Sequence, residues 1–352
     1  MSGSLGDKTE EARYTAANIP TNLLRCLSAT LAELGVDASR TTVGLGFSIE
    51  DLANPSCRVS FRQGSVMIRR ALQMTKGKAL GLEIGRRETV FSIGLVGFAM
   101  VTCPTLGDAV SLGVSRQQFT GAMLHFDLLT EPGRISVAAS SRFPEPDIQI
   151  FLVEEAFASF LQVARGLIGP AFRPLRIDLC HSAPSYADVY RDLFDCEVRF
   201  GQTANLFVSD ADWMARKLPT HDPLSHRQTM QFLELSTARE QESLELVTSV
   251  ERLLRQNLAE MPTLADIARQ LCLSERTLRR RLTDQGVSFQ SLLDGQRRNR
   301  ALELLGNSKL SIEQVAFAVG FSDPHNFRRA FRRWTGSAPS EMRAATAEIW
   351  PQ

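Results

Sequence analysis

Two short segments near the end of the chain place basic side chains at the same helical spacing. They are Arg276, Arg279 and Arg280 in the first segment and His325, Arg328 and Arg329 in the second. A guanidinium can bridge the O6 and N7 acceptors of guanine in the DNA major groove, or hold phosphate oxygens and fix the register. These six residues therefore indicate binding of double-stranded DNA. Catalysis would need a different set of side chains.

A repeated apolar pattern must position these basic residues, and it predicts helix-turn-helix motifs at 264–285 and 312–335. The repeat consists of Leu264, Ile267, Ala268 and Leu271, which recur 48 residues later as Ile312, Val315, Ala316 and Val319. Leu278 and Leu282 lie four residues apart and must face the core of the first motif, as Phe327 and Phe331 must in the second. One such match is a weak signal, but two tandem copies with equivalent basic positions are a strong one.

Residues with capping chemistry stand where the helices of both motifs should begin and end. Ser274 is expected to cap the second helix of the first motif, because its hydroxyl can satisfy a free backbone N–H. Asp323 can cap the corresponding helix of the second motif, with Pro324 in the first helical position. Gly286 falls where the end of a helix favours a left-handed residue. An apolar helical face over 289–305 predicts a joining helix, which suits recognition helices about one DNA turn (~34 Å) apart.

Charge is concentrated in this part of the chain. Residues 262–345 carry +6, from 14 Lys and Arg against 8 Asp and Glu, whereas the whole chain carries +1, so the remainder is near −5. The alternative to DNA contact is that the arginines only form a solvated helix face. Their clustering, together with this charge asymmetry, favours a nucleic-acid-binding domain joined to a near-neutral partner domain.

The chain as a whole, with 43% hydrophobic and 22% charged residues, has the composition of an ordinary globular protein. Residues 1–15 are small and polar, which predicts a disordered tail and not a signal peptide. The longest apolar run, 90–103, is too short for a membrane span of ~20 residues. Six cysteines without metal-ligand spacing suggest a reducing cytoplasm. We therefore expect a cytoplasmic protein with no membrane partner. Cys180 with Cys196 is the one pair that could act as a redox sensor.

Periodicity and turn residues predict an α+β fold: an N-terminal mixed α/β effector-sensing domain and a C-terminal all-α domain with the two helix-turn-helix motifs. The expected boundaries are a sensing and dimerisation domain at 16–210, a linker at 211–243 and a DNA-binding domain at 244–345. Within the linker, 210–217 should form a short helix and 218–223 should break regular structure, with helical periodicity returning over 230–257. Predicted helices of the first domain are 21–35, 63–75, 105–115 and 149–168, and predicted strands are 90–101, 119–129, 133–140, 174–180, 196–200 and 204–208. Glu131-Pro132-Gly133 indicates a hairpin turn.

No catalytic residue, metal site or cofactor is predicted, since the histidines are scattered and no glycine pattern matches a phosphate loop. The effector-binding residues are not identifiable from the sequence. We expect an effector pocket lined by 90–101, the 119–140 hairpin and the strands within 174–208. The arginines Arg58, Arg62, Arg69 and Arg70 could hold a carboxylate, although a solvated helix face is the better default.

The last 100 residues resemble the DNA-binding domain of the AraC/XylS family of bacterial transcription regulators. The matching residues are Ile312, Val315, Ala316, Gly320, Phe321, Ser322, Phe327, Arg329, Phe331, Arg332, Arg333, Gly336, Pro339 and Arg343, with Arg297, Arg300, Ala301, Leu304 and Leu305 in the joining helix. Two positions depart from the family pattern: Met342 replaces a usual tyrosine and Gln296 a usual apolar residue.

The first half is similar to the arabinose-binding-type sensor domain of one branch of that family. The resemblance is carried by Gly81 to Gly85, Gly94 to Gly97, Pro104 to Ala109, Gly169, His181, Pro184, Tyr186, Phe194, Phe200, Gly201, Leu218 and Pro219. Members of this branch respond to varied small molecules, so the resemblance implies a sensor and does not name arabinose as the effector.

Together, the residues and the resemblance predict a transcription regulator, by resemblance an activator, that is controlled by a small-molecule effector. Its partners would be double-stranded DNA, the effector, RNA polymerase and, if it dimerises, a second copy. One alternative is a ligand-independent regulator whose first domain only dimerises. Another is a DNA-repair enzyme fused to this DNA-binding domain, which would need a reactive Pro-Cys-His-Arg motif. The chain has Leu179-Cys180-His181-Ser182 instead.

Overall fold

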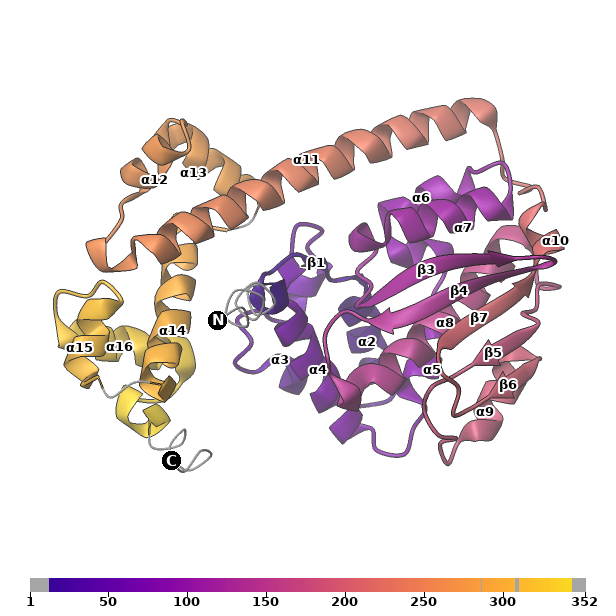
Figure 1. Ribbon diagram of the computed structural model, residues 1–352, viewed down its shortest axis with the longest axis horizontal. Helices are drawn as coiled ribbons and strands as arrows, with labels where there is room; N and C mark the ends of the chain where they lie inside the picture. The colour runs from indigo at the N-terminus through magenta and orange to yellow at the C-terminus, as the bar shows by residue number, and fades with distance from the viewer. Residues whose placement is uncertain (1–12, 286, 308–309, 344–352) are drawn as a thin grey trace. The chain divides into compact units, whose positions relative to one another are not determined.

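The computed structural model describes residues 13–285, 287–307 and 310–343, which form two compact units (Figure 1). Unit 1 spans Met1–Ala238 and unit 2 spans Arg239–Gln352. Unit 1 is a mixed sheet covered by helices, and unit 2 is entirely helical in its described part, so the predicted α+β class is confirmed. None of the described helices is long and apolar enough to cross a membrane.

Most of the helices of unit 1 precede the strands of its main sheet. Its helices are α2 (Asn22–Glu33), α3 (Ser39–Thr42), α4 (Phe61–Met74), α5 (Leu80–Gly85), α6 (Leu95–Val101), α7 (Leu106–Ser115), α8 (Pro146–Ile168), α9 (Ala187–Phe194) and α10 (Ala211–Met214), with 3-10 turns η1 (Glu50–Ala53), η2 (Val90–Ile93) and η3 (Gln117–Phe119). Its strands are β1 (Ile19–Pro20), β2 (Arg58–Val59), β3 (Leu124–Glu131), β4 (Arg134–Ser141), β5 (Arg176–Asp178), β6 (Glu197–Arg199) and β7 (Asn205–Asp210).

The main sheet has the order β3-β4-β7-β5-β6, and all its neighbours are antiparallel except β5 and β6. The predicted hairpin is confirmed, because Glu131 pairs with Arg134 across the turn and Gly133 has φ 73°. Aromatic rings join the sheet to α8: Phe157 and Phe160 lie edge-on to Phe207 of β7, at centroid distances of 5.9 and 6.0 Å. This contact places α8 across one face of the sheet.

Helix α8 packs tightly against α5, because two glycines let the backbones approach. A Cβ built on Gly81 would lie 2.5 Å from the Phe151 carbonyl oxygen, and one on Gly85 would lie 2.3 Å from that of Glu155. Both distances are far below van der Waals contact. The predicted helix at 149–168 is confirmed, with Gly169 at φ 99° after its last residue.

In the region of 90–129, one predicted strand is helical and the other begins later than predicted. Residues 90–101 form η2 and α6, with Gly94 between them at φ 71°, and Thr89 begins η2 with a capping box. A short apolar run does not by itself distinguish a buried helix from a buried strand, and the glycine-separated turns decided the outcome here. The strand predicted at 119–129 begins later, at Leu124, because η3 and a turn occupy the residues before it.

The start of the chain and the connection between the units also differ from the prediction. Of the tail predicted at 1–15, residues 1–12 lie outside the described residues. Residues 13–15 are helical, because the Tyr14 ring packs on Phe61 and Phe143 and its hydroxyl donates to Glu145. Within the predicted linker, 211–243, the short helix expected at 210–217 is present as α10, whereas the residues from Pro223 onward belong to α11 (Pro223–Gln256), a single helix that continues into unit 2.

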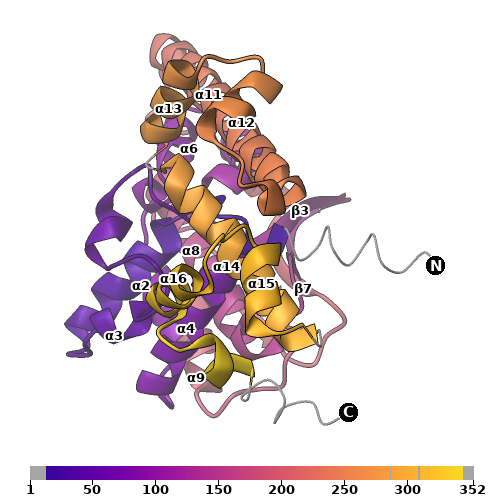
Figure 2. The same cartoon turned by 90° about the vertical axis from the view of Figure 1, so that its left-hand side faces the viewer.

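Unit 2 consists of the later part of α11 and of helices that form two small apolar cores. These elements are η4 (Leu258–Glu260), α12 (Leu264–Gln270), α13 (Glu275–Asp284), α14 (Phe289–Asn307), α15 (Ile312–Ala318) and α16 (Pro324–Thr335). Leu292 and Leu293 near the start of α14 pack with α12 and α13, whereas Ala301 and Leu305 pack with α15 and α16. Both views show the two helix pairs at opposite ends of α14 (Figures 1 and 2).

Candidate nucleic-acid interface and ligand cavity

The first helix pair, α12 and α13, is fixed by caps at both helix starts. Thr263 accepts from the Asp266 N–H at 3.3 Å while the Asp266 side chain accepts from the Thr263 N–H at 3.0 Å, which forms a capping box. Ser274 accepts from the Thr277 N–H at 3.1 Å, so the predicted cap of α13 is confirmed. The buried face of α13 is Leu278 and Leu282, as predicted. Gly286, the predicted end of this helix, lies outside the described residues.

The second pair, α15 and α16, repeats this construction. Ser311 and Gln314 form a capping box at the start of α15. Asp323 accepts from the His325 N–H at 2.9 Å, and Pro324 takes the first helical position of α16, so this prediction is also confirmed. Phe327 and Phe331 are fully buried. The same local chemistry therefore presents the opposite face of α13 and of α16 to solvent.

All six basic residues predicted to contact DNA are exposed on these two outward faces. They are Arg276, Arg279 and Arg280 on α13 and His325, Arg328 and Arg329 on α16. None of the six forms an ion pair with another residue of 13–285, 287–307 or 310–343, which leaves their donors available. The spacing of three and four residues puts each trio on one side of its helix. The contact of these six residues with DNA stays a prediction.

Two exposed residues on the same face of α16 were not selected from the sequence. Arg332 follows Arg328 by four residues and Arg329 by three, so it extends the basic face by one turn. Asn326 is exposed in the first turn, and a side-chain amide can bond the N6 and N7 atoms of adenine. The helical period alone could have identified Arg332, whereas nothing in the sequence distinguishes Asn326 from an ordinary surface amide.

Contacts from α14 hold the second motif in place. The Arg297 guanidinium lies 4.7 Å from the centre of the Phe321 ring, and its Nη2 donates to the Gly320 carbonyl oxygen at 2.8 Å. Arg333 of α16 pairs with Asp294 of α14 at 3.0 Å. Gln296, which stands where an apolar residue was expected, is buried and accepts from Arg255 at 3.3 Å. The joining helix α14 is thus hydrogen-bonded to α11, through Arg255, and to the second motif.

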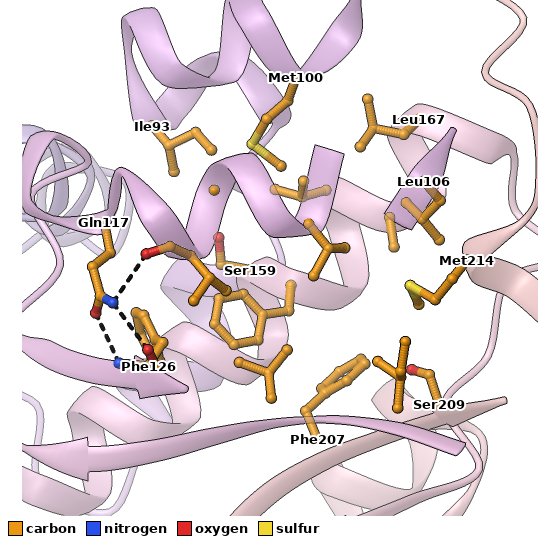
Figure 3. Close-up of a pocket in the computed structure, with 18 of the residues that line it drawn as sticks. Ile93, Met100, Leu106, Gln117, Phe126, Ser159, Leu167, Phe207, Ser209 and Met214 are labelled. Carbon is orange, nitrogen blue, oxygen red and sulfur yellow. Dashed lines mark hydrogen bonds between the residues drawn. The ribbon is translucent and has the colours of Figure 1, made fainter. Parts of the chain in front are cut away.

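Unit 1 contains a cavity of about 110 Å³ between the sheet and helices α7 and α8 (Figure 3). Its wall is almost entirely apolar and includes Ile93, Met100, Leu106, Val110, Phe126, Ile135, Val137, Phe160, Val163, Ala164, Leu167 and Phe207. The Gln117 amide at one end is already engaged. Its nitrogen donates to the carbonyl oxygens of Val114 and Phe126, and its oxygen accepts from the Phe126 N–H. The cavity therefore offers mainly hydrophobic contact to a ligand.

Sequence reasoning identified only part of this wall. Of the three expected segments, 90–101 contributes Ile93 and Met100, although as helices, and 119–140 contributes Thr120, Phe126, Ile135 and Val137. Only β7 among the strands within 174–208 lines the cavity. Helices α7 and α8 supply much of the remaining wall, and no pattern in the sequence showed which of their buried faces would be left open.

Comparisons with known protein families match both units. The arabinose-binding domain of AraC transcription regulators, an N-terminal domain, matches residues 35–218, and a helix-turn-helix domain matches residues 267–345. The first match alone spans more than half of the 352 residues. The chain belongs to the AraC family of transcription regulators. The resemblance found in the sequence is therefore confirmed, and the helix-turn-helix domain of this regulator binds DNA.

Individual relatives align with most of the chain or with its DNA-binding part. The ornithine utilization regulator of Pseudomonas aeruginosa is 30% identical over 334 residues, which cover 94% of this chain and 98% of that protein. The regulator VqsM of the same species is 26% identical and covers 75% of this chain and 83% of its own. Among solved structures, the DNA-binding domain of AdpA in complex with a target DNA is 33% identical over 30% of this chain and 96% of that one, with a TM-score of 0.28.

Three of the four arginines considered as carboxylate binders are engaged elsewhere in the regulator: Arg58 donates to the carbonyl oxygens of Pro55 and Cys57, and Arg69 and Arg70 also have other partners. Arg69 pairs with Glu145 and Asp147, and Arg70 donates to the backbone oxygens of Thr41 and Val43. Neither lines the cavity. All six cysteines are free thiols, including Cys180 and Cys196. The described part of the regulator contains no cluster of His, Cys, Asp and Glu that could hold a metal ion.

A buried carboxyl joins α8 to α9 in unit 1. Glu154 is 3% exposed and accepts from the Tyr186 hydroxyl at 2.9 Å and the Tyr190 hydroxyl at 2.5 Å. Burial raises its pKa to about 7, although both tyrosines and the Gly81 N–H partly oppose the rise. The carboxyl therefore titrates near neutral pH.

This pKa predicts that the regulator loses stability as the pH rises from about 5 to 8. The folded protein keeps a proton that the unfolded chain, with an ordinary pKa of 4.5, releases. The free energy of unfolding therefore falls through this window, by up to about 3 kcal/mol from Glu154 alone. Urea unfolding of Glu154→Gln at several pH values should show a flatter fall, whereas Glu131→Gln, at the exposed hairpin, should keep the wild-type slope. An unchanged slope in Glu154→Gln would refute the assignment.

Proposed function

We propose that this regulator is an activator controlled by a small molecule bound in the 110 Å³ cavity of unit 1. The observation that carries the proposal is this apolar cavity, enclosed within the arabinose-binding-type domain. A ligand that binds one conformation better than another shifts the population toward it, which gives the cavity control over DNA binding. RNA polymerase and a second copy of the chain are the macromolecular partners we expect.

The six exposed residues of α13 and α16 are proposed as the DNA contacts. A helix-turn-helix reads DNA by placing its second helix in the major groove. In this regulator α13 and α16 are the second helices, and their outward faces carry the two basic trios. The effector cavity and the DNA contacts thus lie in different units, so the two activities should be separable by mutation.

We propose no catalytic role. A DNA-repair enzyme of the alternative type needs a cysteine thiolate, and partial burial raises the pKa of the Cys180 thiol. The neighbouring His181 has its Nδ1 atom 2.9 Å from the Ser182 carbonyl oxygen, so this nitrogen is turned toward the backbone. Both observations disfavour Cys180 as a nucleophile.

Filling the cavity tests the proposed control by an effector. Ala164 lies on α8 in the cavity wall, and Ala164→Phe should occupy much of the space. We expect this variant to bind an operator selected from random duplex DNA with wild-type affinity. Its transcriptional reporter should no longer respond to an effector found by thermal-shift screening of metabolites, a panel that includes ornithine because of the named relative. Ala53→Phe, at an exposed position of η1, is the matched control.

The outcomes separate the alternatives. A reporter that responds normally in Ala164→Phe would show that the effector binds elsewhere. A reporter that no metabolite changes in the wild-type protein would favour the ligand-independent regulator. An effector that lowers transcription would contradict the assignment as an activator.

A further inference from the structure

A second cavity of about 60 Å³ adjoins the apolar one, and two glutamates line it. The residues that line both cavities are Ile93, Thr120, Phe126, Ser159 and Phe160. Figure 3 shows Ser159, Ile93 and Phe126 among the side chains around the larger space. Glu88 and Glu155 belong to the smaller cavity alone. A ligand that extends past these shared residues from one cavity into the other would have an apolar environment at one end and carboxyl groups at the other.

The two carboxyl groups lie together, with Glu88 buried and Glu155 half-buried. Glu88 is 7% exposed, and the Ser159 hydroxyl donates to its Oε2 at 2.6 Å. Glu155 lies one helical turn before Ser159 on α8, and its hydrogen-bond partner is the Glu88 carboxyl. Burial raises the pKa of both groups, and the charge of Glu88 raises that of Glu155 further. Two carboxyl groups in hydrogen-bond contact cannot both ionise readily without a cation nearby.

The described residues supply no such cation by direct contact. No ion pair joins Glu88 or Glu155 to a Lys, Arg or His within 13–285, 287–307 and 310–343. From α2, Arg25 lowers the pKa of Glu88 through space while its side chain is exposed, and the Cys26 thiol bonds to Glu88. No described Lys, Arg or His lines either cavity. Glu155 therefore faces the cavity with only another acid as its partner.

We propose that the effector carries a cationic ammonium head, which binds between Glu88 and Glu155, and an apolar body, which fills the larger cavity. This inference rests on the proposed function of the cavity. An ammonium group has three donors and no acceptor, which matches two carboxylates and the Ser159 hydroxyl. Its charge removes the repulsion between the two acids, and such charge-assisted hydrogen bonds are the stronger kind. An anionic head would meet only carboxyl groups.

The cavity volumes set the size of the probe. An apolar cavity of about 150 Å³ holds benzene in another protein, so the two spaces here suit a ligand of roughly seven non-hydrogen atoms. Hexylamine has this size. Hexan-1-ol and hexanoate keep its six-carbon chain and change the head group to a neutral or an anionic one. The three compounds thus isolate the charge of the head.

The test measures binding of these compounds to the full-length regulator by calorimetry. We expect hexylamine to bind at least about tenfold more tightly than hexan-1-ol, and hexanoate to bind weakest. Glu155→Gln should weaken hexylamine about tenfold and leave hexan-1-ol unchanged, whereas Glu131→Gln should alter neither. Because burial raises the pKa of both carboxyl groups and a bound ammonium favours their ionised forms, hexylamine binding should release protons. Comparison of buffers with different ionisation enthalpies detects this release, and Glu155→Gln should reduce it.

Each contrary result has a distinct meaning. If hexan-1-ol binds as tightly as hexylamine, and Ala164→Phe abolishes both, the cationic head is refuted while the effector cavity stands. If hexylamine does not bind, or binds equally well to Glu155→Gln, the proposal is also refuted. The proposed function fails only if, in addition, Ala164→Phe keeps a normal effector response. Should Glu155→Gln fold poorly, Ser159→Ala removes one acceptor for the ammonium and should weaken hexylamine but not hexan-1-ol.

Discussion

Arg280→Ala and Arg329→Ala are each expected to weaken specific DNA binding by about 1–3 kcal/mol, which is roughly 5- to 150-fold. Both side chains are exposed at equivalent positions of α13 and α16, on the face opposite the buried Leu282 and Phe331. Because each recognition helix should contact its own stretch of operator, the two losses should be nearly additive in the double variant. The double variant should therefore lose most of the specific binding.

Gel-shift titration of an operator selected from random duplex DNA measures these losses. An arginine that bonds a base should relax the preference at one position, whereas one that bonds phosphate should reduce the salt dependence of binding instead. Arg191→Ala removes an exposed arginine from α9 in unit 1 and controls for the change in net charge. Wild-type affinity in both single variants would show that the recognition faces are assigned wrongly.

The DNA-binding unit could be predicted from the sequence because its signals are local and repeated. The caps Ser274 and Asp323 lie within three residues of the N–H groups they satisfy, and the buried pairs on α13 and α16 follow the helical period. Such features need no knowledge of distant parts of the chain. The faces that they expose follow directly, which is why all six basic residues lie at the surface as expected.

The ligand cavity could not be predicted because it depends on contacts between distant segments. Glu88 and Glu155 are 67 positions apart and have the residue type of a solvated surface, yet both line an internal space. Their position follows from the approach of α5 to α8, which Gly81 and Gly85 permit. The sequence showed these glycines only as part of a family resemblance. The wall formed by α7 and α8 likewise depends on how these two helices pack against the sheet, and no local pattern encodes that packing.

The start of helix α11 shows a different limit of prediction from sequence. Pro219 and Pro223 indicated a break, and the polar stretch after them was read as part of a linker. The structure starts α11 at Pro223, where a proline is tolerated because the first helical N–H has no partner. Leu233 is fully buried in unit 1, and Val250 and Leu254 are fully buried in unit 2. The packing in unit 2 agrees with the helical periodicity predicted over 230–257, whereas the start of the helix at Pro223 and its packing in unit 1 were not predicted.

Gly320→Ala is expected to destabilise unit 2 by about 3 kcal/mol or more and to abolish specific DNA binding. Gly320 has φ 79°, a conformation that costs other residues about 1–3 kcal/mol. Its added Cβ would also lie 2.2 Å from the Leu258 carbonyl oxygen, so η4 and the α15–α16 turn would have to separate. That separation would disturb the bond from Arg297 to the Gly320 carbonyl, which fixes the second motif on α14.

Gly336→Ala provides a control that isolates the steric part of this effect. Gly336 ends α16 with the same φ of 79°, but a Cβ added there meets nothing within 4 Å. It should therefore cost only the conformational term and leave operator affinity close to wild type. Chemical unfolding followed by the fluorescence of Trp334, which lies against Phe321 in unit 2, measures both variants. If the two substitutions cost the same, the contact between Gly320 and Leu258 is not tight in solution, and the second motif does not depend on it for its position.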